Sequence, residues 1–252
     1  MIFASDKGLI LSKNVDMKKF SQIYDLAVLR KGSEQDLLSI LPVIKTSELV
    51  LAQSDDRLLS MMSKCIFQAG FSWKVVDKKW PEFEVVFHNF DPLKMELLSD
   101  EDLERLVKDA RIIRNMQKIK TVPKNAQWMN EISERQGSFS RFLFDWPCED
   151  FTGLLKLLKK RGERLGGNTG QRFLRLAGID GFILTRDVIL GLQNGGLEIS
   201  DVVTSKHDLQ LVQAAFNHWH QETGLPFSHM SKILAYSAGD NYDVEFLREQ
   251  MH

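Results

Sequence analysis

The spacing of apolar residues constrains the fold of this chain more than any other feature. Apolar side chains recur at intervals of three and four, and alternation with a period of two is rare. One such run extends from Leu58 to Ile66, and another joins Phe83, Phe87 and Phe90. This spacing is typical of amphipathic helices that bury one face. We therefore predict an all-α fold built from short helices.

Short motifs predict where several of these helices begin and end. A helix that starts at Asp55 is expected to stop near Gly70, and Pro81 is expected where another helix begins. A serine followed three positions later by an acidic residue forms a capping box. Two such patterns predict further helix starts, Ser99 with Asp102 and Ser205 with Asp208.

Composition narrows the class of protein. The formal net charge of −1 gives no general attraction to nucleic acid, so any DNA-binding surface must be a local basic patch. Cys65 and Cys148 lie far apart in the sequence, which indicates neither a disulfide framework nor a Cys-rich zinc site. The sequence shows no signal-peptide pattern and no apolar run of the ~20 residues that span a bilayer. We expect a soluble, cytoplasmic protein without membrane contact.

Residues 154–174 predict a helix, a tight glycine-rich turn and a second helix. The turn reads Leu-Gly-Gly-Asn-Thr-Gly, and Phe173, Leu174 and Leu176 are expected to face inward from the second helix. Glycines let the backbone approach a phosphate closely. The first amides of the second helix point outward at the positive end of its dipole. This helix-hairpin-helix pattern predicts contact with the DNA backbone, which carries no base sequence information.

Basic side chains around this turn are expected to create a local positive field that the net charge conceals. The alternative is a turn that merely joins two helices beside a solvated basic face. The residues expected to bind DNA are Lys160, Arg164, Gly166, Gly167, Thr169, Gly170 and Arg172.

The segment from Gln68 to Trp73, Gln-Ala-Gly-Phe-Ser-Trp, resembles the Gln-Ala-Gly-x-Ser-Trp signature of the type I 3-methyladenine-DNA glycosylases. Residues 87–92, 102–115 and 157–162 resemble later segments of that family in the same order. The resemblance covers about residues 55–191. It implies an all-α helix-hairpin-helix DNA glycosylase fold without a cofactor. We expect an N-terminal helical extension over 1–54, the glycosylase core over 55–200 and a C-terminal helical layer over 201–252.

The resemblance further implies hydrolytic removal of an alkylated purine, such as 3-methyladenine, from double-stranded DNA during base excision repair. Methylation at N3 leaves the base positively charged, so it departs without strong acid catalysis, and aromatic faces attract such a cation. The damaged nucleotide must leave the base stack first. Trp73 stands at the position of the family's stacking tryptophan, with a buried core tryptophan as the alternative. The expected base pocket comprises Trp73, Phe71, Phe67, Cys65 and Gln68.

The superfamily also carries a catalytic aspartate shortly after its hairpin. Asp187 is the candidate here, to stabilise the developing sugar cation or to orient the attacking water. An ungapped match instead places Thr185 at that position, and the type I branch is not known to depend on the aspartate. Another carboxylate, not yet placed, is therefore the alternative.

Two departures from the family pattern qualify what the resemblance implies. Cys65 stands where the family has a glutamate that binds the flipped base, and a thiol is a poor substitute as hydrogen-bond acceptor. The family's structural zinc uses cysteines at both chain ends, and this chain has none before Cys65 or after Cys148. We therefore expect no metal. His218 and His220 point to different sides of a helix and are expected at the surface.

Three functional classes follow. The first is an active glycosylase, expected to act as a monomer. The second is a non-catalytic protein of the same fold that recognises damaged DNA, which the cysteine at position 65 favours. The third is a helical interaction protein without affinity for DNA.

Overall fold

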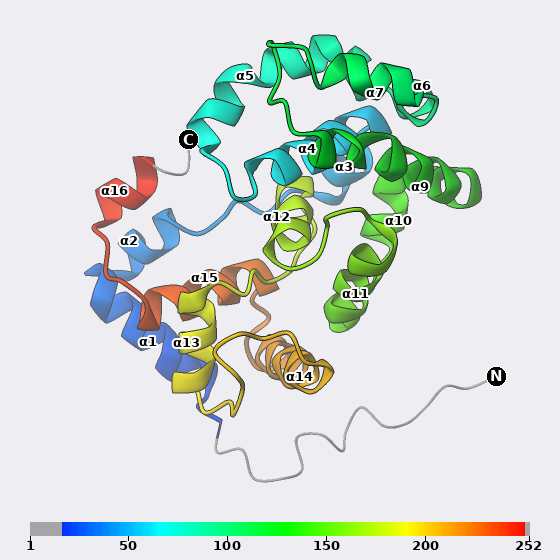
Figure 1. Cartoon of the computed structure of the whole chain (residues 1–252). Coiled ribbons are helices and arrows are strands. Elements are labelled where there is room, and N and C mark those ends of the chain that lie inside the picture. Colours follow the sequence, from blue (N-terminus) through cyan, green and yellow to red (C-terminus); the bar gives the residue numbers. More distant parts are fainter. Residues whose placement is uncertain (1–16, 250–252) are drawn as a thin grey trace, which may run out of the picture. The chain divides into compact units, whose positions relative to one another are not determined.

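The computed structural model describes residues 17–249, and every regular element in this range is a helix (Figure 1). The predicted all-α fold is confirmed. By its internal contacts the described chain divides into two units. The first combines residues 17–44, 148–152 and 180–249, and the second combines 45–147 and 153–179. The first unit thus joins residues from both ends of the described chain.

The second unit holds most of the segments that carry the resemblance. α11 (Phe151–Arg161) begins in the first unit and continues into the second. The other helices of the second unit are α3 (Ser47–Leu51), α4 (Asp55–Gln68), α5 (Trp73–Val86), η1 (His88–Phe90), α6 (Pro92–Glu96), α7 (Asp100–Leu106), α8 (Met116–Ile119), α9 (Thr121–Gln136), α10 (Phe139–Phe144) and α12 (Asn168–Ala177).

An aromatic stack forms part of the core of the second unit. Trp80 and Phe83 are stacked with ring centroids 4.7 Å apart, and Phe87 and Phe90 are stacked at 5.2 Å. The three phenylalanines are fully buried, which confirms the predicted apolar face. Offset aromatic pairs at such distances add to the stabilisation from burial.

The predicted helix start at Pro81 is wrong. α5 begins eight residues earlier, at Trp73, and Pro81 lies inside it. A proline inside a helix removes one backbone hydrogen bond and costs about 3 kcal/mol. Trp80 and Phe83, on either side, are buried in the aromatic stack, and their burial offsets this cost.

The capping residues are placed as expected. Ser99 and Asp102 form a reciprocal capping box at the start of α7. The side chain of Ser205 accepts a hydrogen bond from the backbone N–H of Asp208 at the start of α14. Both interactions satisfy backbone amides that a helix start leaves open.

The first unit is organised around a second aromatic cluster. Phe182 stacks on Phe216 with ring centroids 4.4 Å apart, and Phe227 lies 5.5 Å from Phe216. Asp180 caps the helix that begins at Phe227, because its carboxylate accepts the backbone N–H groups of Phe227 and Ser228 at 2.8 Å each. The helices of this unit are α1 (Phe20–Lys31), α2 (Glu34–Ser39), η2 (Cys148–Asp150), α13 (Arg186–Asn194), α14 (Lys206–Thr223), α15 (Phe227–Ala238) and α16 (Val244–Glu249).

None of the helices between residues 17 and 249 combines the length and the apolar character needed to cross a bilayer.

Candidate base pocket and DNA-binding hairpin

The turn between α4 and α5 carries the glutamine-to-tryptophan signature. Gly70 has a φ of +67°, a left-handed conformation that glycine adopts without strain. The buried Lys118 fixes this turn from α8: its Nζ donates to the carbonyl oxygens of Phe67 at 3.0 Å and of Ala69 at 2.7 Å. Burial lowers the pKa of Lys118. A cation at the carbonyl end of α4 also complements the negative end of the helix dipole.

The hairpin predicted over 154–174 is present, with α11 ending at Arg161 and α12 starting at Asn168. Gly167 occupies the N-cap of α12 with a φ of +58° and provides no side-chain cap. Gly170 lies so close to the turn that an added Cβ would come within 2.2 Å of the carbonyl oxygen of Leu165. Gly170 is buried and makes this internal approach possible, whereas Gly167 is exposed and Gly166 is half-buried.

Asn125 of α9 fixes the hairpin backbone from the side. Its Oδ1 accepts the backbone N–H of Glu163 at 2.8 Å, and its Nδ2 donates to the carbonyl oxygen of the same residue at 3.2 Å. Asn125 is fully buried. The next residue, Arg164, has a φ of +59°, an uncommon conformation for a residue with a side chain. The two hydrogen bonds help to hold the strained backbone in place.

The basic residues of the hairpin differ in their environments. Lys160 is exposed at the end of α11. Arg164 is also exposed and donates to Oε1 of Gln117 at 2.9 Å. Arg161 forms an ion pair with Glu131 at 2.6 Å. Lys160 and Arg164 therefore keep accessible positive charge beside the open amides at the start of α12.

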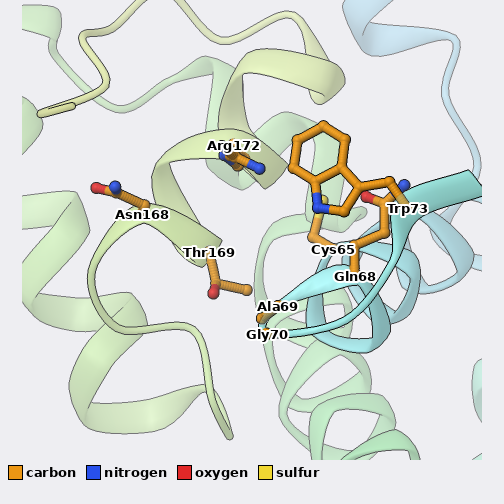
Figure 2. A pocket seen from close by; sticks show the side chains of 8 residues that line it. All are labelled: Cys65, Gln68, Ala69, Gly70, Trp73, Asn168, Thr169 and Arg172. Carbon is orange, nitrogen blue, oxygen red and sulfur yellow. The ribbon is translucent and has the colours of Figure 1, made fainter. Parts of the chain in front are cut away.

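A pocket of about 440 Å³ lies between the α4–α5 turn and the start of α12, all within the second unit (Figure 2). The structure brings together three of the residues expected to hold the base with two expected to bind DNA, and it adds Ala69, Gly70 and Asn168. The lining residues are Cys65, Gln68, Ala69, Gly70, Trp73, Asn168, Thr169 and Arg172.

Trp73 is a pocket residue rather than a core residue, with 47% of its surface exposed. One face of its indole is covered by Arg172, whose guanidinium carbon Cζ lies 4.2 Å from the ring centroid. Figure 2 shows the two side chains next to each other. This is a cation–π contact, so one face of the ring expected to stack a cationic base already holds a cation.

The other predicted aromatic residues do not line the pocket. Phe67 is fully buried, and its ring meets that of Phe83 edge-on at 4.7 Å. Phe71 lies in the signature turn and is 45% exposed. On α12, Phe173 and Leu174 are buried as predicted, but the prediction for Leu176 is wrong because its side chain is 48% exposed. At 100° per residue, Leu176 is turned away from the face that the other two bury.

The pocket has amide and thiol groups but no carboxylate among its described lining residues. Burial raises the pKa of Cys65 to about 12, so its thiol stays protonated at neutral pH. The Nε2 of Gln68 donates to Oδ1 of Asp77 at 3.0 Å, and Lys64 pairs with the same oxygen at 2.9 Å. Arg172 is therefore the charged group of the lining.

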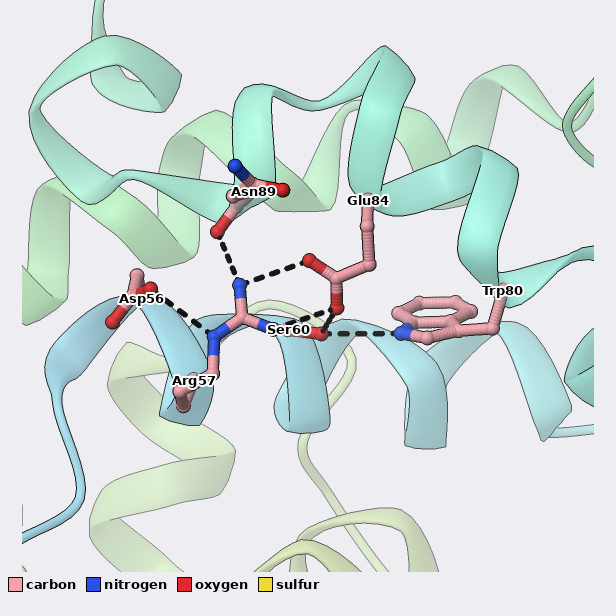
Figure 3. A network of polar contacts seen from close by, with 6 residues as sticks. All are labelled: Asp56, Arg57, Ser60, Trp80, Glu84 and Asn89. Carbon is pink, nitrogen blue, oxygen red and sulfur yellow. Dashed lines mark hydrogen bonds and ion pairs between the residues drawn. The ribbon is translucent and has the colours of Figure 1, made fainter.

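A polar network attaches α5, which carries Trp73, to α4, which carries Cys65 (Figure 3). Nη1 and Nη2 of Arg57 donate to the carboxylate of Glu84 at 3.0 and 2.9 Å. Ser60 also donates to Glu84 and accepts the indole N–H of Trp80 at 3.1 Å. The network orients the two helices that form one side of the pocket.

Arg57 also stabilises the unusual turn after α5. Its Nη2 donates to the carbonyl oxygen of Asn89 at 2.6 Å. The turn residues His88, Asn89 and Phe90 have φ values of +49°, +54° and +56°. Such left-handed conformations cost on the order of 1 kcal/mol each outside glycine, and the hydrogen bond from Arg57 offsets part of this cost.

The candidate aspartate lies outside the pocket lining. Asp187 is in the first turn of α13, in the first unit, with its carboxylate against Gly239. Thr185, the alternative from the ungapped match, is the N-cap of this helix and accepts the backbone N–H of Val188 at 3.3 Å. A catalytic role for Asp187 stays a prediction.

Of the two histidines expected at the surface, His218 is exposed, whereas His220 is half-buried. Nδ1 of His220 lies 2.8 Å from the carbonyl oxygen of Leu225, and its ring contacts Phe227 edge-on. Between residues 17 and 249, no three histidine, cysteine or acidic side chains cluster as metal ligands.

Sequence reasoning missed three residues of this site. Lys118 and Asn125 act on backbone groups 49 and 38 residues away, and no local pattern predicts such partners. Asn168 belongs to the predicted hairpin, but the sequence pattern does not assign it to the pocket. Its position as the first residue of a helix beside a candidate pocket was the available signal.

Within residues 17–249, α11, the glycine turn and α12 form a helix-hairpin-helix that borders the side-chain pocket. Residues 49–164 match the sequence profile of a family described as methyladenine glycosylase. Over this segment, the chain is similar to that family.

Two curated relatives and one solved structure show how far the likeness extends. DNA-3-methyladenine glycosylase 1 of Escherichia coli K12 is 33% identical over 120 residues, 40% of this chain and 64% of the relative. The match thus spans less than two thirds of that relative. DNA-3-methyladenine glycosylase of Haemophilus influenzae is 28% identical over 131 residues, 44% of this chain and 71% of the relative. The structure of 3-methyladenine DNA glycosylase I from Staphylococcus aureus has 28% identity and a TM-score of 0.45, covering 50% of this chain and 77% of that one.

Proposed function

We propose that this protein is a DNA glycosylase that hydrolyses the N-glycosidic bond of alkylated purines, such as 3-methyladenine, in double-stranded DNA. The observation that carries the proposal is the pocket itself. One wall of the pocket contains Trp73, the tryptophan of the signature. The opposite wall is the first part of α12, the helix expected to contact the DNA backbone. A nucleotide turned out of the duplex beside the hairpin can thus reach an aromatic surface.

In the proposed reaction the hairpin binds the DNA phosphates. The damaged nucleotide then leaves the base stack of the duplex, and its base enters the pocket. Gln68 and Asn168 line that pocket with amide groups able to hydrogen-bond the edges of a purine. Water then attacks the anomeric carbon of the sugar as the base departs. Because N3 methylation already makes the base positively charged, the leaving group needs no strong acid from the protein. Asp187 or another carboxylate would stabilise the sugar cation or orient the water.

The enzyme is proposed to act as a monomer in the cytoplasm on alkylated double-stranded DNA. The two cysteines support this location, because both are free thiols in the described chain.

The test is incubation of the purified protein with methylated duplex DNA. Released bases are identified chromatographically, and abasic sites in the same sample are counted. The proposal expects one abasic site for each methylated purine released. Absence of both at high enzyme concentration defeats it.

A second candidate function is lesion binding without base release. It is favoured by one observation, the absence of a carboxylate among the described lining residues, where Cys65 is protonated and Arg172 carries positive charge. This function predicts tighter binding to methylated than to unmodified duplex with no released base. The same incubation, combined with a binding titration, distinguishes the two functions.

A further inference from the structure

Arg172 covers one face of Trp73, the aromatic ring in the pocket lining on which a base is proposed to stack. Its guanidinium lies 4.2 Å from the ring centroid of Trp73, measured from Cζ. The guanidinium is planar and delocalised, and such groups stack on aromatic rings. One face of the Trp73 ring is therefore covered by the protein's own side chain, while 47% of the residue's surface stays exposed.

The donors of Arg172 are available for another partner. Within residues 17–249 its guanidinium has no carboxylate partner and no hydrogen bond, and Cys65 is its electrostatic neighbour. An arginine that is half-buried without a counter-ion has unused N–H groups in a fork that matches a phosphate. Its pKa is lowered by burial, yet arginine remains charged at neutral pH.

The position and the chemistry of Arg172 both suit a DNA phosphate as its partner. It lies on α12, four residues after Asn168, where the helix begins with an uncapped N-terminus. A bidentate, charge-assisted bond to a phosphate is stronger than a cation–π contact at a partly exposed ring. DNA bound at the hairpin would thus draw Arg172 away from Trp73.

We propose that Arg172 is a specificity-determining residue that covers Trp73 in the free protein and moves onto a DNA phosphate when a damaged nucleotide enters. The inference rests on the proposed function. A base within DNA arrives together with phosphates that remove Arg172. A free base brings no phosphate and must compete with the guanidinium for the ring. The pocket therefore accepts the base while DNA is bound and disfavours the free base once the DNA has left.

The first experiment measures binding of free 3-methyladenine by calorimetry in the absence of DNA. Arg172→Gln removes the charge and is expected to bind the base at least fivefold more tightly than wild type. Arg105→Gln removes the same kind of charge from an exposed position on α7 outside the pocket lining, and is expected to match wild type. Circular dichroism verifies that both variants are folded. Equal or weaker binding by Arg172→Gln, or binding by none of the proteins, overturns the inference.

The second experiment repeats the titration with a short unmodified duplex present. The duplex is expected to raise the affinity of wild type for the free base at least threefold and to leave Arg172→Gln unchanged, because binding of two ligands is coupled through the side chain they both displace. A wild-type affinity that does not rise overturns the inference.

Base release from methylated duplex is scored separately. If these binding changes occur without any release, the proposed glycosylase activity fails while the role of Arg172 stands. If bases are released but binding of the free base is the same in wild type and Arg172→Gln, the proposed role of Arg172 fails while the proposed glycosylase activity stands.

Discussion

Asn125 and Glu163, 38 residues apart, are joined by two hydrogen bonds that run in opposite directions. The side chain of Asn125 thereby pairs with both the backbone N–H and the backbone carbonyl oxygen of Glu163 at the turn of the hairpin. Because Asn125 is fully buried, water cannot replace it. The shape of the hairpin thus depends on a residue of α9 as well as on the glycines of the turn.

Asn125→Ala is expected to lower the free energy of unfolding by about 2 kcal/mol, because it leaves a buried N–H and a buried carbonyl without partners. It should also weaken binding to unmodified duplex DNA, since the hairpin loses its fixed shape. Urea unfolding and a binding titration measure the two effects. Asn125→Asp keeps the acceptor for the Glu163 N–H and should retain part of the stability. An Asn125→Ala protein with wild-type values in both assays contradicts this role.

The thiol of Cys65 should make stability depend on pH in alkaline solution. Its pKa is about 12 in the folded protein, against a reference value of 9.0. The folded state therefore keeps a proton that the unfolded state loses, so the contribution to stability is complete below pH 9 and is lost as pH rises toward 12. Between pH 8 and pH 10 the loss should be about 1 kcal/mol.

Urea unfolding of wild type and Cys65→Ala at both pH values isolates this contribution, because all other titrating groups are common to the two proteins. The wild type should lose about 1 kcal/mol more than Cys65→Ala over this interval. Equal losses mean that the thiol does not titrate as its burial requires.

Placing a carboxylate at position 65 should increase base release. Cys65→Glu supplies a negative charge that attracts a cationic base and can pair with Arg172, which would uncover Trp73. We expect about a tenfold gain in kcat/KM on methylated duplex, equivalent to about 1.4 kcal/mol. Cys65→Gln has nearly the same shape without the charge and serves as the control. A carboxylate variant no faster than the amide variant argues against charge in the pocket as the limiting factor.

Arg57 should contribute more to stability than a typical surface arginine. Arg57→Ala removes two hydrogen bonds to Glu84 and one to the carbonyl of Asn89, with an expected loss of about 2 kcal/mol. Arg105 pairs with Asp102 at an exposed position, and Arg105→Ala should cost less than about 0.5 kcal/mol. Urea unfolding of the two variants compares them directly, and similar losses contradict the role assigned to Arg57.

The parts of the site that depend on short sequence patterns were predictable. The signature from Gln68 to Trp73 and the glycine turn were recognised from neighbouring residues, and both prove to line or adjoin one pocket. The capping box at Ser99 was predictable for the same reason, since its two members lie three residues apart.

The remainder depends on contacts that no local pattern encodes. Lys118 and Asn125 reach backbone groups far away in sequence, and the stack of Arg172 on Trp73 joins side chains about one hundred positions apart. Pro81 was misleading because burial of its neighbours overrides its local preference for a helix start. Phe67 directly precedes the signature in the sequence, but its side chain is buried in the aromatic core.

The most direct test of the central claim is single-turnover release of 3-methyladenine from methylated duplex by wild type, Trp73→Ala and Trp146→Ala. Trp146 does not line the pocket, and its ring contacts Phe142. We predict release by wild type and by Trp146→Ala at rates within twofold of each other, and at least a hundredfold lower rate for Trp73→Ala. No release by wild type, or equal release by all three proteins, would contradict the account.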